Sequence, residues 1–301
     1  MNLGVVIVTY NRLDKLIKAV SCFDTQTKFP ICMIIVDNAS TDGTKDYLQN
    51  WVKDQSKYKK IVITNPSNLG GSGGFKRGLE EGLSQKLDWI WVSDDDAFPE
   101  IDALSKVYYN IEHYDDKCSA ICGSVINNGK FDLVHRRRIK KGFFNVTSYS
   151  VPETEYSKVY FEIDEFSYVG TIINVQALIK YGLTRDEYFI YYDDTEHSLR
   201  LRQYGKIRCF PDIKIHHDVE YRTVEFSWKN YYSIRNRIDM YNSLFGTRYS
   251  TFFVIKQVCK NLLRRILNFN KNIIELYDVA IKDGKSGNLG KSKKYIPGWK
   301  L

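Results

Sequence analysis

The stretch Trp89-Ile-Trp-Val-Ser-Asp94-Asp95-Asp96-Ala97 is the one around which the rest of the chain can be arranged. Its apolar start predicts a short buried strand, and three consecutive carboxylates follow that strand directly. Adjacent like charges are unfavourable unless a cation lies between them. Hard divalent cations take oxygen ligands from carboxylates and diphosphates. The stretch is therefore open to two interpretations, a divalent-cation site or an exposed acidic turn.

The composition is that of a globular protein, with 301 residues that are 43% hydrophobic and 27% charged. No run of about 18 apolar residues occurs, so we expect no transmembrane helix. Residues 1–8 lack the basic region and cleavage site of a signal peptide. Of the six cysteines only Cys118 and Cys122 are close in sequence, and we expect free thiols in a reducing cytoplasm.

The net charge of +8 is unevenly distributed. Residues 226–301 contain 15 Lys and Arg but 4 Asp and Glu, whereas the remainder contains 29 and 32. We therefore expect a catalytic domain over residues 1–225 and a basic helical extension over residues 226–301. Because the basic charge lies away from the acidic motifs, we expect no nucleic-acid partner.

Short apolar runs alternate with helical spacing along the first 97 residues. This alternation predicts right-handed βαβ units and an α/β fold with a doubly wound, mainly parallel sheet. We expect strands over residues 3–8, 31–36, 61–64 and 89–92. Ligands bind such sheets beyond the carboxyl ends of the strands. Four polar segments lie at those ends and predict a single site: Thr9–Arg12, Asp37–Asp42, Asn68–Gly74 and Asp94–Asp96.

The middle of the chain is less regular. We expect the glycine-rich segment to be a loop, with a helix beginning at Phe75. The basic run Arg136–Lys141 predicts a solvated loop, and Phe166–Asn174 predicts a strand leading into a helix. Asp193 and Asp194 precede a further helix, whose N-terminal dipole favours an anion. A plain capping role for these two carboxylates is open at this point.

Residues 252–271 predict one amphipathic helix. Packing against the catalytic domain and contact with a membrane both explain its apolar stripe. Its basic face favours an anionic bilayer surface. The apolar positions are Val254, Val258, Leu262, Ile266 and Phe269, and the basic positions, spaced four apart, are Lys256, Lys260 and Arg264.

Taken together, the motifs resemble the inverting nucleotide-sugar glycosyltransferases of family 2, which have the GT-A fold. The resemblance covers roughly residues 3–240, and its most specific parts, Asn68–Phe75 and the full Asp triplet, are most similar to bacterial galactofuranosyltransferases. Rhamnosyltransferases share the Tyr232–Asn236 element and remain the alternative. The other segments that carry the resemblance are Val8–Arg12, Val36–Gly43, Asp193–Asp194 and His217.

The resemblance implies a metal centre and a general base. Asp94, Asp96 and His217 would bind the metal, and a mixed carboxylate and imidazole set suits Mn²⁺ better than Mg²⁺. Asp194 would deprotonate the acceptor hydroxyl, with Asp193 as the alternative base. For the histidine ligand, the neighbouring His216 is the alternative.

The resemblance also implies that the first domain divides into a donor-binding half, about 1–97, and an acceptor and base half, about 98–225. On the acceptor side we expect Phe166, Tyr168 and Asp193, because aromatic faces can stack on sugars. Backbone glycines would allow close approach to the donor. The side chains expected to bind the donor are Thr9, Arg12, Asp37, Asn68, Lys76 and Asp95.

The function implied is metal-dependent transfer of galactofuranose from UDP-galactofuranose, or of rhamnose from dTDP-rhamnose. The acceptor would be a hydroxyl of a lipid-linked or growing bacterial surface polysaccharide, as in capsule or cell-wall assembly. We expect a cytoplasmic enzyme on the inner face of the plasma membrane, with self-association through the C-terminal helices. The competing class is a nucleotide-sugar-binding, membrane-associated scaffold, which the intact metal and base carboxylates disfavour.

Overall fold

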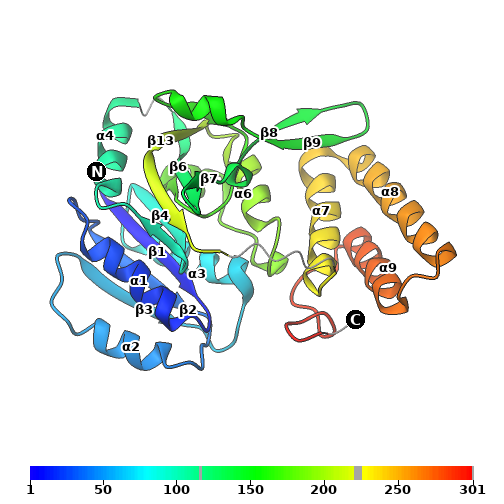
Figure 1. Cartoon of the computed structure of the whole chain (residues 1–301), viewed down its shortest axis with the longest axis horizontal. Coiled ribbons are helices and arrows are strands. Elements are labelled where there is room, and N and C mark those ends of the chain that lie inside the picture. Colours follow the sequence, from blue (N-terminus) through cyan, green and yellow to red (C-terminus); the bar gives the residue numbers. More distant parts are fainter. Residues whose placement is uncertain (115–116, 220–225, 300–301) are drawn as a thin grey trace.

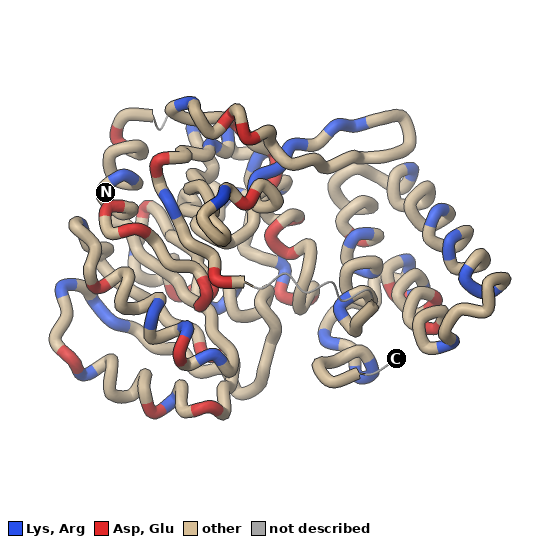
Figure 2. The backbone as a smooth tube through the Cα atoms, viewed as in Figure 1, with Lys and Arg blue, Asp and Glu red and all other residues tan. Residues whose placement is uncertain are grey.

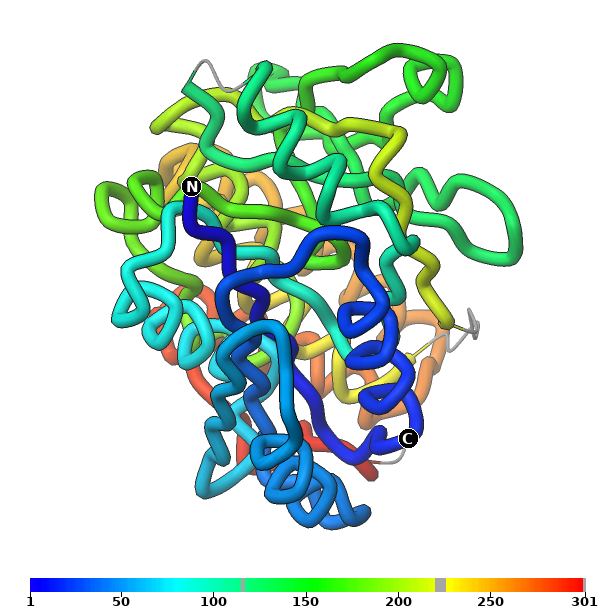
Figure 3. The backbone as a smooth tube through the Cα atoms, turned by 90° about the vertical axis from the view of Figure 1, so that its left-hand side faces the viewer, coloured from blue at the N-terminus to red at the C-terminus, as the bar shows by residue number. Residues whose placement is uncertain are grey.

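A computed structural model describes residues 1–114, 117–219 and 226–299. Figure 1 shows a central sheet flanked by helices, with three C-terminal helices beside it and the β8–β9 hairpin reaching across to them. Seen from the side of the sheet, the C-terminal helices lie behind the N-terminal half (Figure 3). Among the described residues, no helix combines the length and hydropathy needed to span a bilayer.

The central sheet has ten strands and is mixed. Its main path runs β10-β13-β6-β12-β4-β1-β2-β3, with β5 paired to β13 and β7 paired to β6. Pairs β1/β2, β2/β3, β1/β4 and β6/β13 are parallel, whereas β12 lies antiparallel between β4 and β6. The strands are β1 (Leu3–Thr9), β2 (Cys32–Asp37), β3 (Lys59–Thr64), β4 (Trp89–Asp94), β5 (Ala97–Pro99), β6 (Cys118–Asn127), β7 (Lys130–Phe131), β10 (Phe161–Ile163), β12 (Thr171–Asn174) and β13 (Lys206–His217).

Helices cover both faces of this sheet, because alternate residues of a strand point to opposite sides. On β1, Val5 and Ile7 pack with α1 (Leu13–Asp24), α2 (Thr44–Trp51) and α4 (Ala103–Tyr114). Val6 and Val8 pack with α3 (Gly70–Ser84) and α5 (Val175–Tyr181) on the other side. Both faces of the strand are buried, which explains its continuous aliphatic run. The predicted α/β fold with C-terminal helices is confirmed.

The glycine-rich segment is helical, so the prediction of a loop up to Phe75 is wrong. Helix α3 begins at Gly70. A Cβ atom on Gly74 would meet Val8 Cγ1 at 2.5 Å, and one on Gly78 would meet Val6 Cγ1 at 2.3 Å. The glycines therefore let α3 lie directly on β1.

The basic run also differs from its prediction, because it forms strand β8 (Arg136–Lys141) and not a solvated loop. Strand β8 pairs with β9 (Val146–Ser150) and β11 (Glu165–Phe166) in a second sheet. Arg136 is fully buried and donates to the carbonyl oxygens of Gly123 and Val169. A buried guanidinium is tolerated where such acceptors satisfy it. The predicted strand over residues 166–174 is split into β11 and β12.

The C-terminal part folds into three helices, α7 (Lys229–Phe245), α8 (Thr247–Ile266) and α9 (Lys271–Ser286). The helix predicted over residues 252–271 is displaced by five residues, since α8 begins at Thr247 and ends at Ile266. A core of side chains from all three helices holds them together, including Ile238, Phe253 and Ile281. The division into two domains near residue 225 stays a prediction.

Candidate active site

The three consecutive carboxylates lie at the carboxyl end of β4 and in the turn before β5, where the end of β1 supports them. Thr9 Oγ1 donates to Asp95 Oδ2 over 2.8 Å. Arg12 Nη1 donates to Asp95 Oδ1 over 3.1 Å and to Asp96 Oδ2 over 2.6 Å. Asp95 and Asp96 are buried, whereas Asp94 keeps part of its surface exposed. The structure thus brings together five of the predicted site residues.

Burial and like charge shift the pKa values of these carboxylates. Burial, aided by the charges of Asp96 and Asp95, raises the pKa of Asp94 well above its usual value. Burial also raises the pKa of Asp95 to about 6, although Arg12 opposes the shift. For Asp96 the hydrogen bond of His217 and the charge of Arg12 outweigh burial, so its pKa is lowered. A bound cation would relieve this concentration of negative charge.

Strand β13 brings His217 to the carboxylates. It pairs antiparallel with β5, which places His217 opposite Ala97. His217 Nε2 lies 3.4 Å from Asp96 Oδ1, and its buried Nδ1 has no hydrogen-bond partner among the described residues. The neighbouring His216 is exposed on the other face of the strand, with Nε2 3.2 Å from Glu100 Oε1. Of the two histidines, His217 is the one that faces the site.

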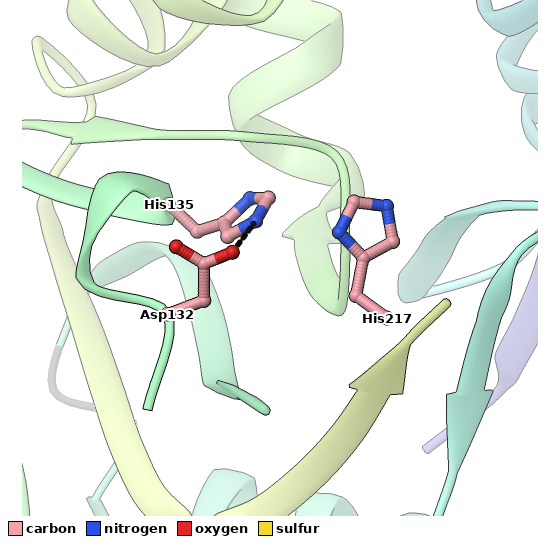
Figure 4. A group of neighbouring side chains, drawn as sticks. All are labelled: Asp132, His135 and His217. Atoms are coloured by element: carbon pink, nitrogen blue, oxygen red, sulfur yellow. Dashed lines mark ion pairs between the residues drawn. The ribbon is translucent and has the colours of Figure 1, made fainter. Parts of the chain in front are cut away.

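Two further side chains, Asp132 and His135, lie beside His217 (Figure 4). Asp132 directly precedes the short helix η1 (Leu133–His135), and His135 ends it. His135 Nε2 lies 3.3 Å from Asp132 Oδ2, and the rings of His135 and His217 are 5.1 Å apart. One ligand atom from each of Asp132, His135 and His217 lies within 4.8 Å of the others. Our sequence analysis missed Asp132 and His135, whose only signal is an Asp-x-x-His spacing.

The residues present fit a divalent cation. Asp96 Oδ1 and His217 Nε2 are 3.4 Å apart, which allows both atoms to bind one ion, because the distance from a metal ion to a nitrogen or oxygen ligand is about 2.0–2.2 Å. Within the described residues, the predicted set of Asp94, Asp96 and His217 does not gather its ligand atoms as closely as Asp132, His135 and His217 do. His217 belongs to both sets, so it is the common element of any metal site here.

The end of β2 supplies a buried acceptor. Asp37 is 1% exposed, and its Oδ1 accepts from the backbone N–H of Ser40 over 3.0 Å. Its Oδ2 is buried without a hydrogen-bond partner among the described residues. Buried polar atoms are normally paired. Asp37 Oδ2 is therefore well suited to accept from a ligand.

Two further residues predicted to bind the donor have structural partners instead. The side chain of Asn68 accepts from the N–H of Gly70 over 2.7 Å, and its carbonyl accepts from Lys291 Nζ over 3.2 Å. Lys76 Nζ forms a 2.8 Å ion pair with Asp186 at the surface. Asn68 therefore shapes the entry to α3, and Lys76 links α3 to the segment before α6.

Helix α6 (Asp193–Leu201) begins with the two candidate bases. Asp193 is 8% exposed, and burial together with the charge of Asp194 raises its pKa to about 7. Asp194 is less buried, and its Oδ1 accepts from the N–H of Thr195 over 2.6 Å. The charge of Asp193 adds to the burial that raises the pKa of Asp94, and the charge of Asp194 adds to the burial that raises the pKa of Glu165. Asp193 thus lies toward the triplet and Asp194 toward Glu165.

The turn that leads into α6 has an unusual backbone. Phe189, Tyr191 and Tyr192 have φ values of +65°, +66° and +65°. Residues with a Cβ atom adopt this region only where their surroundings enforce it. Gly70 lies against the turn, since a Cβ atom on it would be 2.0 Å from the carbonyl oxygen of Phe189. The 189–192 turn is therefore packed against the start of α3.

Helix α7 and residue 290 hold the same turn from the other side. Arg235 is 1% exposed, and its Nη2 donates to the carbonyl oxygen of Tyr188 over 3.1 Å. Its Nη1 donates to the carbonyl oxygen of Gly290 over 2.5 Å, and the N–H of Gly290 donates to the carbonyl oxygen of Glu187 over 2.6 Å. Asn236 also donates to the carbonyl oxygen of Tyr188, and to those of Ile190 and Tyr191. The Tyr232–Asn236 motif thus acts on the backbone before the candidate bases.

The two aromatic residues predicted on the acceptor side lie in the core. Phe166 is fully buried and Tyr168 is 4% exposed. The Tyr168 ring packs on Phe75 with centroids 4.3 Å apart, and its hydroxyl hydrogen-bonds His197 Nδ1 over 2.8 Å. These rings support β12 and α6 from inside, and they do not line the cavity described next.

A cavity of about 570 Å³ lies between the β8–β9 hairpin and helices α7 and α8. On the sheet side, Arg137 Nη2 donates to Thr195 Oγ1 over 2.9 Å, and Arg137 Nε lies 3.3 Å from Glu165 Oε2. Because Tyr192 and Thr195 flank the two candidate bases in sequence, the cavity reaches the beginning of α6. Its wall on the α8 side is aromatic and basic, with Phe252, Phe253, Lys256 and Lys260.

Residues 4–182 match the family model described as glycosyl transferase family 2, which covers more than half of the chain. The chain belongs to glycosyltransferase family 2. Among curated relatives it is 36% identical over 92 residues to galactofuranosyltransferase GlfT1 of Mycobacterium tuberculosis, covering 31% of this chain and 29% of that protein. The match therefore spans less than a third of that relative. It is 27% identical over 247 residues to the dTDP-rhamnosyl transferase RfbF of Shigella flexneri, covering 78% of each.

Solved structures share the fold of this family 2 member. GalNAc-T7 with UDP, GalNAc and Mn²⁺ aligns with a TM-score of 0.63 at 16% identity, over 80% of this chain and 48% of that one. Staphylococcus aureus TarS 1–349 with UDP aligns with a TM-score of 0.56 at 14% identity, over 95% and 92%. The mannosyltransferase PcManGT of Pyrobaculum calidifontis, with GDP-Man and Mn²⁺, gives 0.57 at 13% identity, over 95% and 75%. These likenesses support the GT-A fold.

Proposed function

We propose that this protein transfers a sugar from a nucleotide-sugar donor to a hydroxyl group with inversion of configuration. The observation that carries the proposal is the meeting of the ends of β1, β4 and β13 at one place. There Thr9 and Arg12 bond the carboxylates of Asp95 and Asp96, and His217 closes the group. The candidate bases at the start of α6 lie alongside.

The donor would bind with its diphosphate at the triplet. Asp94, Asp96 and His217 would hold Mn²⁺, which when bound supplies a Lewis acid for the departing diphosphate. The solved relatives that carry Mn²⁺ together with a nucleotide or nucleotide sugar support this choice. Arg12 provides a fixed positive charge next to the phosphates. Asp37 Oδ2 would accept a hydrogen bond from the base or the ribose.

The acceptor hydroxyl would lose its proton to a carboxylate at the start of α6. As the oxygen attacks the anomeric carbon, its bond to that carbon forms and the bond to the diphosphate breaks, which inverts the configuration in one step. We propose Asp194 as the base, because Thr195, to which it is bonded, lines the cavity. Asp193 is the alternative, since a pKa of about 7 suits proton transfer at neutral pH.

Galactofuranose from UDP-galactofuranose is the donor that we propose first. The support is the full Asp triplet, the glycine-rich start of α3 and the similarity to GlfT1 over 92 residues. Rhamnose from dTDP-rhamnose is the second candidate, favoured by the similarity to RfbF over 78% of both chains.

For the acceptor we propose a lipid-linked or growing surface polysaccharide, at the cytoplasmic face of the plasma membrane. The cavity beside α6 offers such a molecule a place next to the candidate bases. Its aromatic and basic lining suits a glycan that carries a phosphate. Addition of a single sugar is the expected outcome.

A donor screen with Mn²⁺ tests the proposed function. Release of UDP or dTDP is measured, without acceptor, from UDP-galactofuranose, UDP-galactopyranose, UDP-glucose and dTDP-rhamnose. We expect the fastest hydrolysis with UDP-galactofuranose. Preference for dTDP-rhamnose would replace the first donor by the second. Binding of a sugar nucleotide without hydrolysis of any donor, and without transfer to lipid-linked glycans, would indicate the scaffold.

A further inference from the structure

Most of the large apolar side chains of helix α8 point away from the rest of the protein. The side chains that it buries against the other helices include Ser250, Gln257 and Asn261, with Phe253 as the main apolar contact. Its outward face carries Ile255, which is 55% exposed, and Ile266, which is 75% exposed. The remaining exposed members of that face are Phe252, Cys259, Leu262 and Leu263. An amphipathic helix normally buries its apolar stripe.

The tip of the β8–β9 hairpin continues this apolar face. Phe143, at the tip, is 71% exposed, and its neighbour Phe144 is 46% exposed. The Phe144 ring stacks on Phe252 of α8 with centroids 5.5 Å apart, and Tyr249 Oη donates to the carbonyl oxygen of Gly142 over 3.1 Å. The outward face of α8 and the hairpin tip therefore form one surface, which we call the interfacial surface. Isolated exposed apolar side chains are ordinary, whereas a contiguous set marks a binding surface.

The charge around the interfacial surface decides what covers it. Residues 139–149 and 247–274 contain eight Lys and Arg and no Asp or Glu. Figure 2 shows the basic residues along α8, whereas α9 beside it carries acidic ones as well. A second copy docked face to face would bring two such basic sets together, which is electrostatically unfavourable. A bilayer that contains anionic lipids is complementary in both charge and polarity.

We propose that the interfacial surface docks on an anionic lipid bilayer, with α8 lying in the plane of the membrane. The side chains of Phe143, Ile255 and Ile266 enter the boundary between headgroups and acyl chains, and the surrounding cations contact lipid phosphates. Helices of this kind bind by buried apolar area together with attraction to anionic lipids. No membrane-spanning element is needed for this mode of attachment.

The docking deepens the proposed function by defining how the acceptor arrives. The hairpin and α8 that carry the interfacial surface also form the walls of the 570 Å³ cavity, through Phe144, Phe252, Lys256 and Lys260. A docked protein would hold this cavity next to the lipid headgroups. A glycan linked to a membrane lipid by phosphate could enter it while its lipid remains in the bilayer. This last step rests on the proposed function, but the docking itself does not.

Flotation with phosphatidylcholine vesicles, with and without phosphatidylglycerol, tests the docking with the full chain. We expect binding to the vesicles that contain phosphatidylglycerol and weaker binding at high salt. The combined variant Phe143→Ser, Ile255→Ser and Ile266→Ser should reduce binding about tenfold or more, because three apolar side chains no longer enter the membrane. None of these three residues lines the cavity or contacts the carboxylates.

A matched control removes equally exposed apolar side chains elsewhere. The combined variant Ile101→Ser, Val159→Ser and Ile179→Ser changes residues that are 60%, 65% and 63% exposed, and it should bind vesicles like the unaltered protein. A second readout uses Cys259, the exposed cysteine on the outward face of α8. A nitrobenzoxadiazole probe on this thiol should become brighter and shift to shorter wavelength on addition of anionic vesicles. The same labelling of Cys259→Ser gives the background from the other thiols.

Two results would overturn the docking. One is vesicle binding that is the same with and without anionic lipid, and the same for the unaltered protein and the combined variant at the interfacial surface. The other is an unaltered protein that does not bind vesicles and sediments as a dimer, while the combined variant sediments as a monomer. In that case a second copy of the chain would cover the interfacial surface. Donor hydrolysis measured without vesicles reports on the catalytic proposal separately, so failure of one proposal is distinguishable from failure of the other.

Discussion

Asn236 donates from its side-chain amide to the carbonyl oxygen of Tyr191 over 2.8 Å, and so ties helix α7 to the turn that leads into Asp193. The same amide reaches the carbonyl oxygens of Tyr188 and Ile190, each over 3.0 Å. Because Asn236 is fully buried, its amide must find its partners within the protein, and these three carbonyl oxygens are the acceptors. The backbone conformation before the candidate bases is therefore set by a residue more than 40 positions away.

Replacing Asn236 should impair catalysis more than donor binding. In Asn236→Ala the 189–192 turn loses its buried donor, and its left-handed residues are free to relax. We expect turnover to fall about 10²-fold, the cost typical of a misplaced catalytic group, with little change in the Kd for UDP. The control Asn272→Ala changes an exposed asparagine on α9 and should be neutral. A parallel loss of UDP binding in Asn236→Ala would instead indicate general unfolding.

The glycines at the start of α3 provide a matched pair of variants. Gly70→Ala places a methyl group 2.0 Å from the carbonyl oxygen of Phe189 at a φ of +76°, so either the helix or the turn must move. A Cβ atom on Gly71 meets nothing within 4 Å. We expect Gly70→Ala to lower turnover at least tenfold and Gly71→Ala to leave it unchanged. Similar activity in the two variants would show that the contact between α3 and the turn is not needed.

The assignment of the base is tested by two isosteric changes. Asp194→Asn should leave UDP binding intact while turnover falls by about 10²–10⁴-fold, the usual contribution of a general base. Turnover retained within tenfold would remove Asp194 from this role. In that event Asp193→Asn should produce the larger loss, and the base would be Asp193.

The pH dependence of kcat/KM distinguishes Asp193 from Asp194 as the base in a second way. Asp193 has a pKa of about 7, so it is mostly protonated below that pH and cannot accept a proton. If Asp193 is the base, kcat/KM should rise with pH and level off above about 7. The profile of Asp193→Asn should then lose this limb. A profile of the unaltered protein that is flat between about pH 5 and 8 would exclude Asp193 as the base.

The metal ligands are tested by affinity for Mn²⁺, measured by calorimetry or electron paramagnetic resonance. His217→Gln should weaken Mn²⁺ binding and turnover about tenfold or more, whereas the neighbouring His216→Gln should not, because His216 faces Glu100. His135→Gln separates the two candidate ligand sets. An effect as large as that of His217→Gln would place the ion with Asp132 and His135, and no effect would leave it with the carboxylate triplet. Activity unchanged in EDTA would contradict a metal-dependent reaction.

His197 predicts a loss of stability in acid. It is fully buried between Tyr168 and the carbonyl of Gly182, and burial lowers its pKa to about 3. Between that value and about 6.5 the unfolded chain binds a proton that the folded protein does not. The free energy of unfolding should therefore fall by about 1.4 kcal/mol for each pH unit below about 6.5. His197→Gln keeps a donor and an acceptor and should reduce this slope in urea titrations, whereas an unchanged slope would contradict the buried neutral form.

Much of the fold and part of the site could be predicted from the sequence. The aliphatic run of β1 and the polar residues after each strand predict the sheet and the meeting of Thr9, Arg12 and the Asp triplet. These features are local, because a few consecutive residues are enough to show which side chains of a strand share a face and where the strand ends. The preference for His217 over His216 rests on the family resemblance, and in the structure it is His217 that lies beside Asp96.

What the sequence analysis missed depends on contacts between distant segments. Asp132 and His135 reach His217 only because β6 and β13 pair in parallel, and no local pattern encodes that pairing. The sequence predicts a loop at the glycines of α3, because their close contact with β1 is a tertiary feature. The sequence predicts a solvated loop at Arg136 for the same reason, since the acceptors of this side chain belong to the distant residues 123 and 169.

The contacts of Gly290 with Arg235 and Glu187 affect the order in which the protein becomes functional during synthesis. A chain emerging from the ribosome can form its sheet and the start of α3 early, since domains fold from the N-terminal side as they appear. The 189–192 turn, however, gains its support only when residues 235, 236 and 290 have also been translated. A nascent chain should therefore bind nucleotide before it can turn over, and catalytic competence should be the last property it acquires.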